Sequence, residues 1–188
     1  MANSDCEGGR QKVHEAASEL YQIAALMMAD ESQAVDLVEA AVAQTKIDPC
    51  AEAEASVNAA RVNLVETAVA RLSQADPKAF DAPTVSAPSG GCIEEDDLSA
   101  AGISASQLKG MLHGPGRRTL RNWLEQLPIA QRAIFVERAI LGWDNAAAAA
   151  SLTKSAARNW QPRQVSEVFR QALCSLANSL VHAAVVQA

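Results

Sequence analysis

The chain has 188 residues, of which 49% are hydrophobic but only 4% aromatic, and a formal net charge of −6. This length allows one or two small domains, and no apolar run reaches the roughly 18 residues that a transmembrane helix needs. The N-terminal residues lack the apolar centre of a signal peptide, so we expect a cytoplasmic protein without membrane insertion.

Charge is divided unevenly along the chain. Residues 1–100 hold 6 Lys and Arg against 18 Asp and Glu, a net charge of −12, whereas residues 101–188 hold 10 against 4, a net charge of +6. A basic C-terminal half beside an acidic N-terminal half fits a protein in which one half faces nucleic acid and the other a different partner. The alternative is a pair of solvated surfaces that bind no charged partner.

Two amphipathic helices are predicted near the N-terminus, after a small and polar stretch over residues 1–10 that is typical of a disordered end. The first helix begins at about Gln11, and its apolar face comprises Leu20, Ile23, Ala24, Met27 and Met28. Asp30 is the predicted N-cap of the second helix, with Gln33 three residues later. The apolar face of that helix comprises Ala34, Leu37, Val38, Ala41 and Val42.

A third helix is predicted from about Ala55 to Leu72, after a connector that contains Pro49. Its buried stripe comprises Val57, Ala60, Leu64, Val65, Ala68 and Leu72. Prolines and glycines then interrupt residues 73–105, which favours a flexible linker. The acidic run over residues 94–97 is interpreted as a solvated loop or, alternatively, as a segment that tracks a basic channel or shields the basic half from DNA.

Residues 106–186 are predicted to form a helical domain whose elements end at recognisable signals. A short amphipathic helix ends at Leu127, and Pro128 opens the next, because proline is tolerated in the first turn of a helix. The apolar face of this next helix comprises Ile129, Ala133, Val136 and Ile140. Gly142 is the expected left-handed C-cap, and Asp144 or Asn145 the N-cap of a helix over residues 146–150.

A break near Leu152 is expected to separate that helix from a short one over residues 154–161, which gives the outline of a helix-turn-helix. Arg158 and Asn159 in the short helix are of the right types for bidentate contacts to guanine and adenine. A last amphipathic helix is predicted to start at Pro162, and Trp160 is expected to pack in the core. The apolar face of the last helix comprises Val165, Val168, Phe169, Ala172, Leu176 and Leu180.

Two stretches of the chain resemble bacterial RNA polymerase sigma factors of the extracytoplasmic-function type. In residues 118–178 the matching positions are Leu127, Pro128, Gln131, Arg132, Phe135, Gly142, Trp143 and the alanines at 146–150. In residues 18–72 they are Leu20, Tyr21, Asp30, Ala34, Asp36, Leu37 and Val38. The resemblance implies an all-α protein of two small helical domains, a polymerase-binding domain over residues 11–72 and a DNA-binding domain over residues 106–186, joined by the flexible linker over residues 73–105.

The resemblance also implies which residues carry function. Core RNA polymerase would contact Asp36, Val38 and Glu39. Promoter DNA would contact Arg132, Lys154, Ser155, Arg158, Asn159 and Arg163. Arg61, Asn63 and Arg71 fall in the helix that melts the promoter in this family, although the tryptophan of that helix is missing here and its arginine cluster is reduced to Arg71. The implied function is that of a sigma factor, which directs RNA polymerase to promoters for transcription initiation.

Two other functions stay open from the sequence. One is a degenerate sigma-like regulator that binds polymerase or an anti-sigma factor without initiating transcription. The other is an all-helical interaction module with no DNA role, which the basic C-terminal half disfavours. Core polymerase and promoter DNA are therefore the expected partners, and the resemblance leaves room for an anti-sigma factor.

Catalysis and metal binding find no support in the sequence. No nucleophile motif or paired ligand spacing occurs, so we expect no enzyme activity, no catalytic residue, no metal and no cofactor. Structural zinc needs ligands in closely spaced pairs, whereas Cys6, Cys50, Cys92 and Cys174 are far apart. Free thiols in a reducing compartment are the expected state of these cysteines.

Overall fold

The computed structural model of the protein describes residues 2–28, 30–45, 53–84, 92–114 and 116–186, with side chains for 14–28, 30–45, 54–84, 92–114 and 116–180. No strand occurs in these ranges, so the predicted all-α fold class is confirmed. Contacts divide the chain into two compact units, Met1–Leu72 and Ser73–Ala188. These are called unit 1 and unit 2, and each is described by itself.

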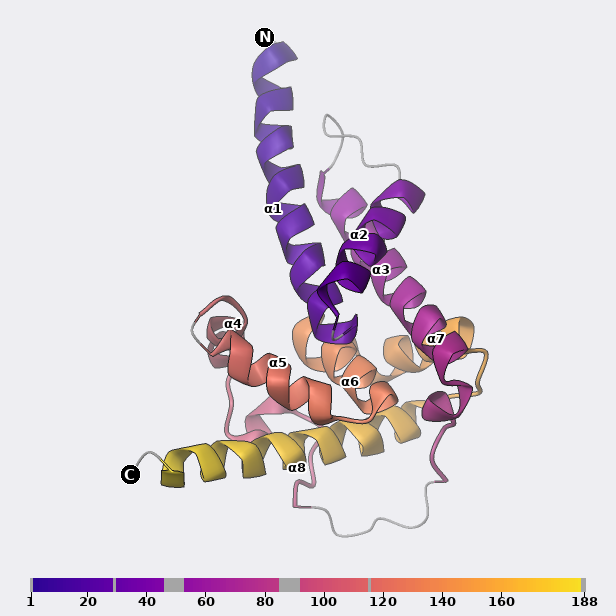
Figure 1. Ribbon diagram of the computed structural model, residues 1–188, viewed down its shortest axis with the longest axis vertical. Coiled ribbons are helices and arrows are strands. Elements are labelled where there is room, and N and C mark those ends of the chain that lie inside the picture. The colour runs from indigo at the N-terminus through magenta and orange to yellow at the C-terminus, as the bar shows by residue number, and fades with distance from the viewer. Residues whose placement is uncertain (1, 29, 46–52, 85–91, 115, 187–188) are drawn as a thin grey trace. The chain divides into compact units, whose positions relative to one another are not determined.

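Unit 1 is built from helices that follow one another up and down along the chain, as Figure 1 shows. They are α1 (Ala2–Met28), α2 (Glu31–Gln44) and α3 (Ala53–Ala75), of which α3 belongs to this unit as far as Leu72. The core between them is formed by apolar side chains at helical spacing, which include Leu20, Ile23, Met27, Leu37, Ala41, Leu64, Val65 and Ala68. The predicted apolar faces of these helices are therefore confirmed at these positions.

The start of α2 follows local chemistry, whereas the start of α1 differs from the prediction. Asp30 accepts a hydrogen bond from the backbone N–H of Gln33 at 3.0 Å, which confirms it as the N-cap of α2. The helix α1 begins at Ala2 rather than near Gln11. No proline interrupts residues 2–11, and two glycines weaken a helix by only about 1 kcal/mol each, so the helical backbone continues toward the N-terminus.

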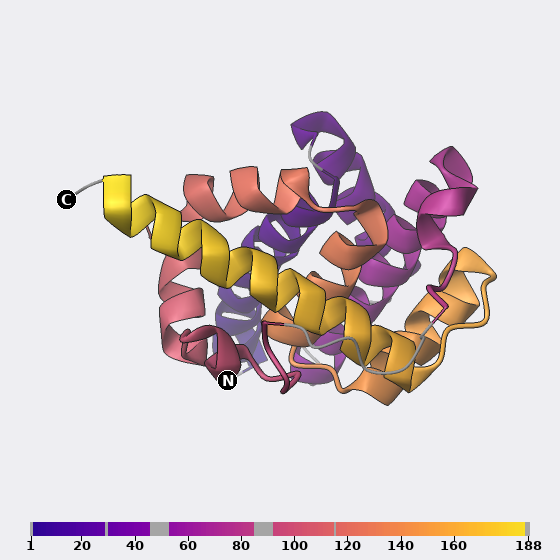
Figure 2. The same cartoon turned by 90° about the horizontal axis from the view of Figure 1, so that it is seen from below.

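The long helix α8 (Pro162–Val186) lies along one side of unit 2, and Figure 2 shows it running across the other helices of the unit. The other elements are η1 (Pro77–Phe80), η2 (Leu98–Ala101), α4 (Ala105–His113), α5 (Arg117–Gln126), α6 (Ile129–Phe135), η3 (Val136–Ile140) and α7 (Asn145–Ala156). The helices α6 and α7 and the short helix η2 pack against α8. Its core contains an aromatic cluster in which Phe135 lies edge-on to Trp123 at 4.9 Å and 6.1 Å from Phe169.

Several helix ends in unit 2 lie where short-range signals placed them. Pro128 directly precedes the first residue of α6. Gly142 has a φ of +70°, the left-handed conformation expected at the end of a helix. Asp144 accepts from the N–H of Ala147 at 2.7 Å and caps α7. Between the end of α6 and Gly142, η3 is a π-helical turn, in which the N–H of Leu141 donates to the carbonyl of Val136 at 3.0 Å.

The range predicted as a flexible linker, residues 73–105, belongs to unit 2 where the structure describes it. Phe80 is completely buried, and Ile93 and Ile103 are nearly so. The indole N–H of Trp160 donates to the carbonyl of Phe80 at 3.0 Å, and Gln164 donates to the carbonyl of Pro83 at 2.9 Å. The prolines and glycines suggested a linker, but the large apolar side chains between them anchor the range to unit 2.

Candidate nucleic-acid interface

The helices α7 and α8, with the turn over residues 157–161, form a helix-turn-helix arrangement. Ala157 ends α7 by adopting a left-handed conformation, with φ 52° and ψ 40°. Trp160 is buried in the turn, and its backbone N–H donates to the hydroxyl of Thr153 at 3.1 Å. The hydroxyl of Thr153 in turn lies 3.3 Å from the carbonyl of Trp160. These contacts fix the angle at which the chain enters α8.

The second helix of this arrangement is α8, and the short helix predicted over residues 154–161 does not form. The helix α7 continues through the predicted break at Leu152, which is fully buried, as far as Ala156. Residues 157–161 are not helical, and α8 starts at Pro162, as predicted. Burial of Leu152 and Trp160 explains why the prediction failed. Both side chains become buried only when the helices pack together, so the local sequence does not reveal it.

Arg132 does not reach the surface, in contrast to its predicted role at DNA. It is 7% exposed, and its guanidinium Nη2 donates to the carbonyl of Glu125 at 3.3 Å. Burial lowers the pKa of Arg132, while the nearby charge of Glu125 opposes this change. The side chain therefore joins α6 to the C-terminal turn of α5 and stabilises the domain from within.

The other predicted DNA contacts are distributed between the end of α7, the turn and the start of α8. Arg158 is held by Asp81, whose carboxylate accepts from its Nε at 2.9 Å. The hydroxyl of Ser155 is buried, which removes it from the surface. Asn159 is exposed and accepts a hydrogen bond from Gln161 at 2.9 Å. Lys154 and Arg163 are exposed as well, and Arg163 occupies the first turn of α8.

A second arginine of α8, Arg170, shares a face with Arg163 because the two are seven residues apart. Its Nη1 donates to the carbonyl of Glu94 at 3.0 Å, and its Nη2 pairs with Glu167. Sequence analysis did not single out Arg170, although its spacing from Arg163 was a usable signal. Together the two arginines give α8 a basic stripe, interrupted by Glu167, on the side that faces away from the core residues Val165 and Phe169.

In the run of acidic residues over 94–97, which belongs to unit 2, Asp96 is half-buried and held by neighbours, whereas the side chains of the other three are exposed. Arg138 donates to the carbonyl of Asp96 at 3.0 Å, and Asn145 donates to its carboxylate at 2.5 Å. Burial acts to raise the pKa of Asp96, but hydrogen bonds from Asn145 and Ser166 and the charge of Arg138 outweigh it, so this pKa lies below its usual value. Asp96 is therefore ionised at neutral pH and tightly held.

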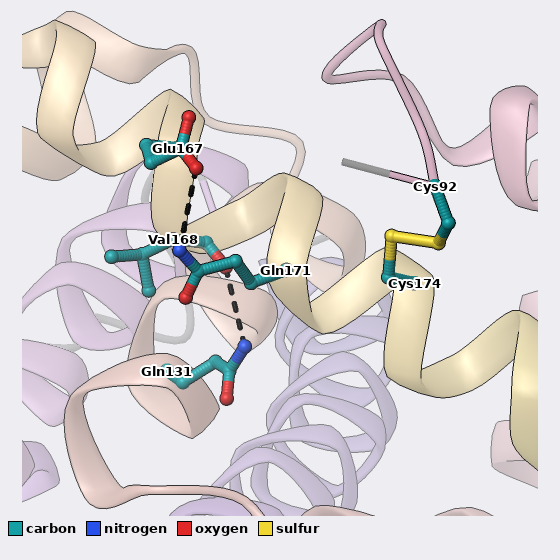
Figure 3. The surroundings of a disulfide bond; sticks show 6 residues. All are labelled: Cys92, Gln131, Glu167, Val168, Gln171 and Cys174. Atoms are coloured by element: carbon teal, nitrogen blue, oxygen red, sulfur yellow. Dashed lines mark hydrogen bonds between the residues drawn. A yellow bond between two sulfur atoms is a disulfide. The ribbon is translucent and has the colours of Figure 1, made fainter. Parts of the chain in front are cut away.

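Cys92, two residues before this run, forms a disulfide with Cys174 of α8, as Figure 3 shows. The prediction of free thiols is wrong for these two cysteines. Nothing in the sequence pairs them, because they are 82 residues apart and share no motif. Cys50 and the side chain of Cys6 lie outside the described residues. Disulfides are typical of oxidising compartments, and in reducing ones they are usually transient or redox-active. The bond therefore either argues against the predicted cytoplasmic location or is itself a transient, redox-active one.

Glu137 is a buried acid that sequence reasoning missed. Its side chain is fully buried in η3, and its Oε1 accepts a hydrogen bond from the hydroxyl of Ser151 at 2.9 Å. Burial raises the pKa of Glu137 to about 8, although the hydrogen bond from Ser151 acts to lower it. The sequence held a signal, since Glu137 follows the buried Ala133 by four residues and so shares its helical face.

In unit 1 the predicted polymerase contacts lie on α2. Asp36 and Glu39 are exposed, and Val38 between them is half-buried. Their neighbour Val35 is 45% exposed, which leaves an apolar side chain at the surface beside the two carboxylates. This part of α2 can therefore present charge and a small apolar area to a partner.

The predicted promoter-melting residues on α3 serve contacts within unit 1. Arg61 pairs with Glu19 of α1 at 2.7 Å and also donates to Asn58. Asn63 donates to the hydroxyl of Thr45, at the end of α2, at 2.8 Å. Arg71 is half-buried on the same helix. Two of the three residues thus join the helices of unit 1 to one another.

Searches for a membrane span or a metal site find neither in the described part of the chain. No helix there combines the length and the apolar character needed to cross a bilayer. Among the same residues, no three side chains of His, Cys, Asp or Glu gather closely enough to bind a metal ion. A scan against protein-family models and searches of curated proteins and of solved structures find no match to this chain.

Proposed function

We propose that the protein is a sigma-like transcription factor, in which unit 2 binds promoter DNA and unit 1 binds core RNA polymerase. The observation that carries this proposal is the α7–turn–α8 arrangement with exposed Arg163 in the first turn of its second helix. A helix-turn-helix contacts base edges with the N-terminal residues of its second helix. The net charge of +6 over residues 101–188 supports the same surface, because phosphate neutralisation dominates affinity for DNA, although the acidic residues over 73–100 lower the net charge of unit 2 to +1.

A second candidate is a sigma-like regulator that binds polymerase, or an anti-sigma factor, without initiating transcription. The observation that favours it is the engagement of Arg61 and Asn63 within unit 1. Promoter melting needs basic or aromatic groups that are available to hold an unpaired base and its backbone. Both candidates are non-catalytic and share the polymerase contact. They differ in that only the first initiates transcription.

DNA binding is tested with the full chain and a pool of random-sequence duplexes over a salt series. We expect log affinity to fall linearly with log salt, and Arg163→Ala to make the slope shallower by about 0.9, because one phosphate contact is lost. The matched control is Arg117→Ala, which removes an equally exposed arginine from the start of α5. The absence of binding at the lowest salt, with the disulfide intact and after its reduction, would contradict the proposal.

Polymerase binding is tested by co-purification of the chain with core RNA polymerase. Asp36→Lys should weaken co-purification, because it reverses a charge on the exposed face of α2, while the helical circular dichroism spectrum stays unchanged. Glu54→Lys makes the same charge change at an exposed position of α3 and should leave binding intact. Capture that is equal for all three proteins would remove the α2 face from the interface. Run-off transcription with the captured complex then separates the two candidates.

A further inference from the structure

The residues from Cys92 to Asp97 are here called the acidic segment. They lie alongside α8, the second helix of the helix-turn-helix. Asp96 accepts a hydrogen bond from Ser166, the carbonyl of Glu94 accepts from Arg170, and Cys92 is bonded to Cys174. The partners on α8 are each four residues apart, so they form one stripe over successive turns. The acidic segment therefore runs along α8 in the opposite direction.

The lengths of the two paths agree with this description. Eight residues of α-helix, from Ser166 to Cys174, rise about 12 Å. The four steps from Cys92 to Asp96 span at most about 13–14 Å when the chain is extended. Three contacts at matching spacing hold the segment against the helix, and Figure 3 shows the covalent one.

The acidic segment occupies the face of α8 that carries the basic stripe. Arg163, Arg170 and Cys174 are spaced by seven and four residues, so they share the face opposite the buried Val165 and Phe169. The segment carries four successive acidic residues, Glu94 to Asp97, so their charge lies near the face where the proposed function requires a DNA backbone. While the segment is in place, Arg170 is engaged by the carbonyl of Glu94 and by Glu167, and the added negative charge opposes the approach of phosphates.

The two ends of the acidic segment are held in different ways. Asp96 is fixed by hydrogen bonds from Arg138 and Asn145, which remain when the thiols are reduced. The Cys92 end is held by the disulfide, by the buried side chain of Ile93 and by the hydrogen bond between Arg170 and Glu94. A hydrogen bond to a charged group contributes only about 1.5–3 kcal/mol and burial of an isoleucine a similar amount, so the disulfide, which closes a loop of 82 residues, is the strongest of these constraints. Cys92 is exposed, which gives a reductant access to it.

We propose that the disulfide between Cys92 and Cys174 is a thiol-controlled latch that holds the acidic segment on the basic face of α8 and frees that face on reduction. A dithiol reductant transfers two electrons and two protons to the sulfur–sulfur bond, which breaks into two thiols while the reductant closes its own disulfide. The chain at Cys92 and Glu94 then separates from α8, against the burial of Ile93, and Nη1 of Arg170 becomes available while Nη2 stays paired with Glu167. Asp96 is the fixed end. The inference rests on the proposed DNA-binding function for its consequence, but not for the release itself.

Release is measured without DNA, as the rate at which phenylglyoxal modifies Arg170 in the full chain, relative to the exposed Arg117, by mass spectrometry. Reduction with dithiothreitol should raise this ratio about tenfold, a typical size for coupling between two states. Cys92→Ser should show the raised ratio at once and should not respond to dithiothreitol. An equal ratio for the oxidised and reduced chains would overturn the latch. Loss of the near-ultraviolet circular dichroism signal of the tryptophans on reduction would also overturn it, because the bond would then serve only to hold the fold.

A DNA titration of the same samples tests the consequence of release. Reduction should raise the affinity of the full chain for duplex DNA by about tenfold, and Cys92→Ser should bind like the reduced protein. Equal affinity in both thiol states, with Arg170 released, would overturn the control of DNA binding and leave the proposed function intact. If neither state binds DNA, the proposed function fails, and the modification of Arg170 still decides whether the latch exists.

Discussion

At the scale of single residues, the raised pKa of Glu137 is a property that the sequence analysis did not predict. Its carboxyl is fully buried, and its Oε2 has no hydrogen-bond partner among the described residues. With a pKa of about 8, the group is mostly protonated at neutral pH, and the cost of burying a charge is avoided. Ser151 satisfies one oxygen and joins α7 to the π-helical turn.

Glu137 should make the stability of the protein depend on pH. Its folded pKa lies above the unfolded value of 4.5, so the folded state binds the proton more tightly between that pH and about 8. The stabilisation is complete below the unfolded pKa and is lost as pH rises through the folded pKa, by at most about 1.4 kcal/mol per pH unit. Urea unfolding at several pH values measures this contribution.

Glu137→Gln isolates the contribution, because glutamine has nearly the same shape and still offers an oxygen to Ser151. The difference in unfolding free energy between this variant and the native protein should change with pH in favour of the variant at alkaline pH. Glu39→Gln, at an exposed position of α2, serves as the control and should show no such trend. A pH-independent difference for Glu137→Gln would contradict the buried, protonated state.

At the scale of elements, sequence and structure agree where a short-range interaction decides. The cap at Asp30, the left-handed Gly142 and the cap at Asp144 were predictable, because each depends on a side chain or a glycine within a few residues. The end of α7 was not predictable in this way. Ala157 takes a left-handed conformation that alanine disfavours by roughly 1–2 kcal/mol, so packing around Trp160 imposes it.

The candidate site shows the same limit. The sequence predicted a helix-turn-helix and named Arg163 as a DNA contact, but it placed the second helix too early and counted Arg132 and Arg158 as available. The buried contact of Arg132 with Glu125 and the ion pair of Arg158 with Asp81 each depend on the folded arrangement. The ion pair of Arg158 joins residues 77 positions apart, which no local pattern reveals.

At the scale of the whole molecule, unit 2 should require residues 73–106 for its stability. We expect a fragment of residues 73–188 to unfold cooperatively, and a fragment of residues 107–188 to be far less stable, because the second lacks buried Phe80 and Ile93. Loss of a buried phenylalanine side chain alone costs about 3–5 kcal/mol. Thermal unfolding followed by circular dichroism, with Phe80→Ala in the longer fragment for comparison, measures the difference. Equal stability of the two fragments would restore the linker interpretation.

The order in which the chain is synthesised determines when the disulfide can form. Cys92 leaves the ribosome before α8 exists, and Cys174 follows 82 residues later. Synthesis adds about 5–20 residues per second, whereas disulfide formation takes seconds to hours. Every newly made molecule therefore begins its life without the bond, and its age and the oxidants that it meets determine when the bond is added. On the proposed mechanism, newly synthesised molecules, whose cysteines are still reduced, are the ones that bind DNA. Older molecules, in which the disulfide has formed, are the inactive ones.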